Sequence, residues 1–161
     1  MSKKTILSII AAAAVVVAAV LIIIFVPNNN NKNTNSSFTA ADKAAATVSI
    51  KANYITFFAA NTVISRRQTL LQNGSQFAQA MQGEFSQLTN EKPSVVVNSV
   101  TFNGPSAATV NYTVNLNGQP VLKNQNGGAV KINGKWLVSD TTMCQLLTMA
   151  GQAPSLCQNI H

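Results

Sequence analysis

The stretch AATVNYTVNLNG, residues 107–118, alternates between two kinds of side chain. One set is apolar and the other carries amides and hydroxyls, so one face of a strand would meet a core and the other would meet water. The Asn-Gly pair at its end is typical of a tight turn between antiparallel strands. The apolar set is Ala108, Val110, Tyr112, Val114 and Leu116, and the polar set is Thr109, Asn111, Thr113, Asn115 and Asn117.

Segments with the same two-residue period lie on both sides of this stretch. Residues 96–102 precede it, and residues 120–125, 129–132 and 135–138 follow it, with Asn-Gly pairs between most of them. These segments predict a meander of four to five antiparallel strands. In the first segment, we expect four side chains to share one side of a strand: Val96, Asn98, Val100 and Phe102. In the last two segments, we expect four side chains to face the core: Val130, Ile132, Trp136 and Val138.

Segments of helical period come before and after the strands. The first is predicted over Phe38–Ala60, with Thr39 as N-cap, and the second over Ile64–Gln72. A third begins at a capping Ser75 and ends near Leu88, and Asp140 is expected to cap a last helix over residues 141–150. The apolar residues at helical spacing in the first helix are Ala41, Ala44, Ala45, Val48, Ala52, Ile55 and Phe58 or Ala59, and we expect them on its inward side.

Helices followed by an antiparallel sheet predict an α+β fold. We expect about three helices packed on one face of a curved sheet, with a C-terminal helix after it.

The N-terminal region contains 22 residues, Thr5–Val26, without one charge. As a helix they would be about 33 Å long, enough to cross a hydrocarbon core of about 30 Å. Lys3 and Lys4 precede them, which favours a cytoplasmic N-terminus. We predict a single-pass signal-anchor in residues 1–27, an Asn-rich flexible tether in residues 28–37 and an extracytoplasmic domain in residues 38–161. The alternative is a cleaved signal that leaves a secreted protein.

The charged residues are few and mostly basic. Residues 28–161 carry nine Lys and Arg against four Asp and Glu, which leaves +5. They form no basic stripe with interleaved aromatic residues, so we expect no nucleic-acid partner. A basic surface fits anionic lipid head groups or acidic wall polymers better.

The two cysteines, Cys144 and Cys157, both follow the predicted span. An even number outside the cytoplasm favours a disulfide, which would contribute about 3 kcal/mol by closing a short loop. A pair of free thiols is the alternative. We expect no metal site, because two Cys and the terminal His161 supply too few ligands.

No set of residues predicts catalysis. His161 is the last residue, and Cys144 has no identifiable base. Glu84 and Glu91 straddle the end of a predicted helix, where a solvated face explains them. No Gly-rich phosphate loop is present. We therefore expect neither an enzyme nor a cofactor.

Three short stretches carry a resemblance to a known family. They are Phe57-Phe58, LLQNGSQF at residues 70–77, and GKWLVS at residues 134–139 followed by CQLL at residues 144–147. The chain resembles the C-terminal domain of the low-molecular-weight secreted antigens of mycobacteria and related actinobacteria. The resemblance implies a cystatin-like or NTF2-like α+β domain that is exported and often anchored or lipidated. It implies no particular reaction.

Two functions are open at this point. The first is a non-catalytic, membrane-anchored envelope module that binds an envelope protein or wall component through the polar strand face formed by Thr109, Asn111, Thr113 and Asn115. The second is a small-molecule or lipid carrier, or an enzyme, with a pocket between helices and sheet lined by Tyr112 and Trp136. A subunit of a larger export complex is a weaker third.

Overall fold

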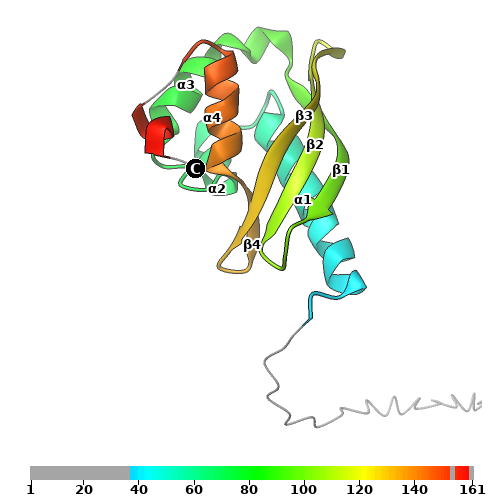
Figure 1. Cartoon of the computed structure of the whole chain (residues 1–161). Coiled ribbons are helices and arrows are strands. Elements are labelled where there is room, and N and C mark those ends of the chain that lie inside the picture. The colour runs from blue at the N-terminus through cyan, green and yellow to red at the C-terminus, as the bar shows by residue number, and fades with distance from the viewer. Residues whose placement is uncertain (1–36, 153–154, 160–161) are drawn as a thin grey trace, which may run out of the picture. The chain divides into compact units, whose positions relative to one another are not determined.

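The computed structural model describes residues 37–152 and 155–159 and confirms the α+β class (Figure 1). Three helices come first, four strands follow, and a fourth helix comes after the strands. The elements are α1 (Ala40–Phe58), α2 (Ile64–Leu70), α3 (Ala78–Gln87), η1 (Thr89–Glu91), β1 (Ser94–Phe102), β2 (Ala107–Leu116), β3 (Gln119–Ile132), β4 (Lys135–Val138), α4 (Asp140–Met149) and η2 (Ser155–Asn159).

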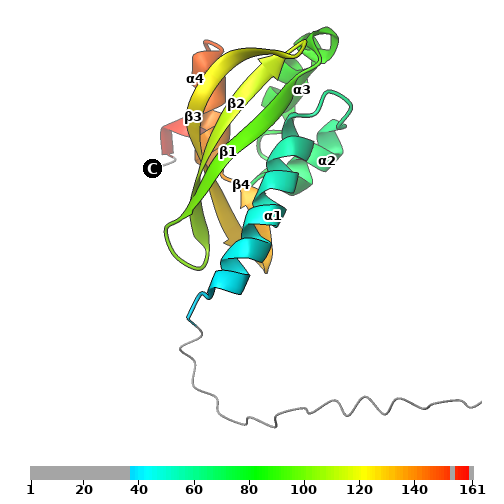
Figure 2. The same cartoon turned by 90° about the vertical axis from the view of Figure 1, so that its right-hand side faces the viewer.

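The strands form one antiparallel sheet in the order β1-β2-β3-β4, as expected for a meander. Two views at right angles show α1 running along one face of the sheet (Figures 1 and 2). The core lies between this face and the helices, where the Tyr112 ring lies 5.4 Å from Tyr54 and 5.6 Å from Phe58. The predicted apolar side of β2 is confirmed, since Ala108, Val110, Tyr112 and Val114 are all buried.

Two of the predicted strands are one. Residues 120–125 and 129–132 both belong to β3, and the glycines between them pair with β2 instead of forming a turn. A Cβ atom on Gly127 would lie 2.7 Å from the Tyr54 hydroxyl and 2.8 Å from Thr142 Oγ1. These glycines therefore allow side chains of α1 and α4 to reach the strand backbone.

Of the residues predicted on the inward side of α1, only Phe58 is buried, and the rest of that prediction is wrong. Val48 and Ile55 are 71% and 51% exposed, and the buried side is formed instead by Ala46, Ile50, Tyr54, Phe57 and Phe58. Alanine is accepted on either side of a helix, whereas the rings bury far more apolar area and so decide which side packs.

Two strand faces also differ from prediction. The four residues predicted to share one side of β1 do not do so, because a register shift between Val97 and Ser99 changes the alternation. Val96 and Asn98 are exposed, whereas Val100 and Phe102 pack against the core. In the β3–β4 hairpin, the two-residue turn pairs Trp136 with Lys131. Because paired residues share a face, Val130 and Ile132 lie on the side opposite Trp136 and Val138, and not in the core.

Helix starts were predicted with mixed success. Thr39 forms a capping box with Asp42, as expected. The N-cap of α4 is Ser139, whose hydroxyl accepts from the Thr142 amide at 3.2 Å, and not Asp140. Ser75 does not cap α3, which begins at Ala78 after a turn.

The predicted membrane span and nearly all of the predicted tether lie outside the described residues. Among the helices that are described, none combines the length and apolarity needed to cross a membrane. Ser36–His161 form a compact unit of their own. All the buried hydrophobic residues of the described part lie between Ala46 and Leu147, so this unit has a complete core and can fold by itself.

Candidate functional site

The predicted polar strand face is a network of side chains that bridge three strands. Asn98 Nδ2 donates to Asn111 Oδ1 at 2.8 Å and to Thr113 Oγ1 at 3.2 Å. Asn111 Nδ2 in turn donates to Asn126 Oδ1 at 3.0 Å. Thr109 Oγ1 accepts from Asn103 Nδ2 at 2.9 Å, and Asn115 lies half-buried at the far end of β2. Much of the hydrogen-bonding capacity of this face is therefore used within the sheet.

Tyr112 and Trp136 do not share a pocket. Trp136 packs against Phe102, with ring centroids 5.8 Å apart, and borders a groove of about 470 Å³ beside the start of α1. Tyr112 borders a different hollow of about 440 Å³, next to Cys144 and Cys157. Burial raises the pKa of Tyr112 to about 12, so this phenol stays protonated at neutral pH.

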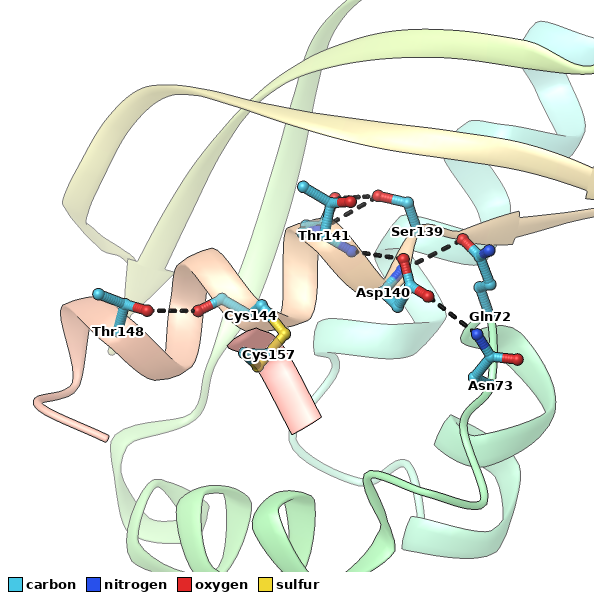
Figure 3. The surroundings of a disulfide bond; sticks show 9 residues. Gln72, Asn73, Ser139, Asp140, Thr141, Cys144, Thr148 and Cys157 are labelled. Carbon is cyan, nitrogen blue, oxygen red and sulfur yellow. Dashed lines mark hydrogen bonds between the residues drawn. A yellow bond between two sulfur atoms is a disulfide. The ribbon is translucent and has the colours of Figure 1, made fainter. Parts of the chain in front are cut away.

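The predicted disulfide is confirmed. Cys144 of α4 is bonded to Cys157 of η2 (Figure 3). At the other end of α4, the Asp140 carboxylate accepts from the Thr141 amide at 2.8 Å and from Asn73 Nδ2 at 2.9 Å. The bridge thus holds the C-terminal segment against a helix whose start is itself fixed.

An apolar pocket of about 260 Å³ lies where α3 and α4 meet the β2–β3 end of the sheet. The sequence left a pocket between helices and sheet open as an alternative, with Tyr112 and Trp136 as its lining, and neither of these residues lines this pocket. Its inner wall is buried and its rim is open, because Val121 and Met149 are both 49% exposed. The lining residues are Phe58, Glu84, Phe85, Leu88, Pro93, Val114, Leu116, Val121, Leu122, Met143, Leu146, Leu147, Met149 and Ala150.

Glu84 is the one charged side chain among these lining residues. Its Oε1 accepts a hydrogen bond from Gln152 Nε2, which joins α3 to the segment after α4. The lining can thus exclude water from a hydrocarbon group, but it holds no nucleophile and base in contact. In the described ranges, 37–152 and 155–159, no three His, Cys, Asp or Glu side chains come together in a way that could hold a metal.

A sequence signal for this pocket exists. Met143, Leu146 and Leu147 lie on one face of α4, and the C-cap residue Ala150 continues the same helical spacing. Such a face normally indicates core packing, and nothing in the periodicity shows that part of the face borders an empty space.

Comparison with known protein families agrees with the resemblance. Comparison with curated proteins finds no match. Residues 42–154, more than two thirds of the chain, match the family described as low molecular weight antigen MTB12, C-terminal domain. The chain therefore belongs to the MTB12 C-terminal domain family.

Proposed function

We propose that this protein is a non-catalytic binding module of the actinobacterial cell envelope, held at the outer side of the membrane by residues 1–27. Its binding site in this proposal is the pocket between α3 and α4. The observation that carries the proposal is that pocket's combination of a buried apolar wall with an open apolar rim.

Energetics favour the pocket over the polar strand face. Covering apolar surface contributes about 25 cal/mol per Å², and Val121 and Met149 leave such surface exposed at the rim. The amides of the strand face already have partners, so a ligand there would exchange one set of hydrogen bonds for another.

The location rests on the sequence and on the disulfide. The uncharged segment Thr5–Val26 follows Lys3 and Lys4, which favours a single span with the domain outside. The Cys144–Cys157 bond fits an oxidising compartment. A secreted form after cleavage would keep the same binding site.

Mass spectrometry of the purified full-length protein tests the binding role. Leu146→Trp would fill the pocket, and Gln145→Trp would place the same ring on the exposed side of α4 as a matched control. We expect an apolar compound to co-purify from the native host with the wild type and with Gln145→Trp, and to be absent from Leu146→Trp. Equal yields from all three forms would contradict the proposal.

Protease treatment of intact cells tests the location separately. We expect residues 38–161 to be digested while cytosolic proteins survive. Survival of this domain under conditions that digest other envelope proteins would contradict an outer location.

A further inference from the structure

We infer that the α3–α4 pocket takes an unbranched acyl or alkyl chain, with about nine carbons buried and the polar head left in water. The inference rests on the proposed function, because it identifies the chemical class of ligand for that same site. It depends on four features of the pocket: its polarity, its aromatic rings, its volume and its opening.

The polarity of the lining excludes hydrogen-bonding groups from the buried part of a ligand. Thirteen of the fourteen lining residues are apolar, and the fourteenth, Glu84, is already bonded to Gln152. A hydroxyl or amide pushed against the inner wall would lose its water and gain no partner, which is unfavourable. The buried part of the ligand is therefore hydrocarbon.

The aromatic rings of the lining are engaged elsewhere in the core. The guanidinium of Arg67 covers the Phe85 ring at 3.7 Å from its centroid. Phe58 packs against the rings of Tyr54, Phe57 and Tyr112, with centroids 5.4 to 6.3 Å away. The pocket thus lacks a pair of free ring faces between which a flat aromatic ligand could stack. Met143, Met149 and the leucines are flexible and can follow an aliphatic chain instead.

The volume limits the length of that chain. The pocket holds about 260 Å³, slightly below the range of about 300 Å³ and above that is usual for drug-sized ligands. A methylene is similar in size to a water molecule, which takes about 30 Å³ in the liquid. About nine carbons would fill the space.

The opening gives the ligand its direction. The pocket runs from buried Met143 and Leu147 to Val121 and Met149 at the exposed rim. A chain that enters tail first leaves its head group outside. Glu84 at this site would repel an anionic head, so neutral straight-chain alcohols are suitable probes.

A series of alcohols from hexanol to dodecanol, titrated by calorimetry into residues 36–161, tests the inference. We expect affinity to rise about fourfold per added methylene, the equivalent of about 0.8 kcal/mol each, and to level off at about nine carbons. An aromatic alcohol of equal carbon number should bind at least about tenfold more weakly. Leu146→Trp should lower the affinity for decanol at least about tenfold, and Gln145→Trp should leave it unchanged.

The outcomes separate this inference from the proposed function. If the aromatic alcohol binds as well as decanol, or if affinity is independent of chain length, the inference is overturned while the pocket remains a binding site. If none of the compounds binds the wild type, the proposed function is overturned as well.

A second arm identifies the source of the chain. Movement of an intact phosphatidylcholine with a fluorescent acyl chain from vesicles to the protein, blocked by Leu146→Trp but not by Gln145→Trp, would support the inference with a membrane lipid as the source. Binding of free alcohols without such transfer would support it with a soluble amphiphile as the source.

Discussion

At the scale of single residues, Arg67 joins the first two helices. It is buried in α2, and among the described residues no carboxylate forms an ion pair with it. Its guanidinium donates to the carbonyls of Phe57, Ala59 and Thr62, where α1 ends, at 2.7 Å for Ala59 and 3.0 Å for Thr62. The carbonyls at a helix C-terminus are partly negative and unpaired, so they take the place of a counter-ion. Burial lowers the pKa of Arg67 to about 10.

Arg67→Lys should destabilise the domain by about 2–4 kcal/mol, because one ammonium cannot reach the three carbonyls and leaves buried acceptors unpaired. Urea unfolding of residues 36–161 measures the change. Arg66→Lys is the control: the Arg66 side chain is exposed and donates only to the Thr69 hydroxyl, so its replacement should cost less than about 0.5 kcal/mol. Equal effects of the two variants would argue against the role given to Arg67.

Replacement of glycine by alanine should change the stability in opposite directions at two positions. Gly127→Ala should destabilise by about 1–3 kcal/mol, since its Cβ would lie 2.7 Å from the Tyr54 hydroxyl. Gly83→Ala should stabilise by about 0.5–1 kcal/mol, because Gly83 lies inside α3 with no atom within 4 Å of an added Cβ. Melting temperatures by calorimetry check both signs. A neutral Gly127→Ala would mean that α1 and α4 do not approach β3 as closely as described.

At the scale of elements, α4 is fixed to the sheet by hydrogen bonds at its start and by a covalent bond further on. The hydroxyl of buried Thr142 accepts from the Gly128 amide at 2.7 Å and lies 2.9 Å from Ser139 Oγ. Tyr54 adds a bond from α1, donating to the Gly128 carbonyl at 2.8 Å. The disulfide then holds η2 against the helix.

Replacing both Cys144 and Cys157 by Ala should lower the free energy of unfolding by about 3 kcal/mol, since the unfolded chain regains the entropy of a short loop. The hydrogen bonds of Thr142 should still hold the start of α4 on β3. Hydrogen exchange should therefore become faster after Met149 and remain slow at Thr142 and Gly128. Loss of protection along the whole of α4 would contradict the claim that Thr142 holds the start of this helix without the disulfide.

The elements that the sequence predicted well are those with one clear period. In β2, polar and apolar residues alternate from Ala108 to Leu116, and Ala108, Val110, Tyr112 and Val114 are buried as expected. The errors arise where local signals have two meanings: the glycines of β3 resemble a turn, and the alanines of α1 fit either side of a helix. Tertiary contacts determine the structure in both places. The close approach of Tyr54 to Gly127 keeps the glycines within β3, and the burial of the aromatic rings of α1 sets which side of that helix packs.

The candidate site was predictable only in part. The disulfide followed from the number of cysteines and the predicted compartment. A pocket between helices and sheet was an alternative only, and was expected beside Tyr112 and Trp136 and not where it lies. Its lining was not predictable, because Leu122, Leu146 and Pro93 meet from three distant segments. Periodicity predicts which side of a helix or strand is buried. It does not predict whether the side chains of neighbouring elements fill the space between those elements completely.

At the scale of the whole molecule, two tyrosines in the core, Tyr54 and Tyr112, are held in their protonated state. Burial raises the pKa of Tyr112 to about 12 and raises the pKa of Tyr54 further. The folded protein therefore keeps two phenolic protons that the unfolded chain releases above about pH 10. Arg67 acts in the opposite sense, since its pKa is lower in the folded protein.

Stability should therefore fall as the pH rises from about 10 to about 12. Two tyrosines oppose one arginine, so the free energy of unfolding should drop by up to about 1.4 kcal/mol per pH unit. Urea unfolding at a series of alkaline pH values measures this slope. Tyr112→Phe removes one of the phenols and should make the slope nearly flat. A slope unchanged in this variant would contradict the buried, protonated state of Tyr112.

The central claim is that the pocket between α3 and α4 binds a hydrocarbon chain, and the methyl groups of its methionines report on this directly. Met143 and Met149 line the pocket, whereas Met81 is buried but does not line it and provides an internal reference. The decisive measurement is an NMR titration of methyl-labelled methionine in residues 36–161 with decanol. We predict that the Met143 and Met149 signals shift together and saturate while the Met81 signal stays in place. Unshifted Met143 and Met149 signals, or equal shifts of all three, would contradict the account.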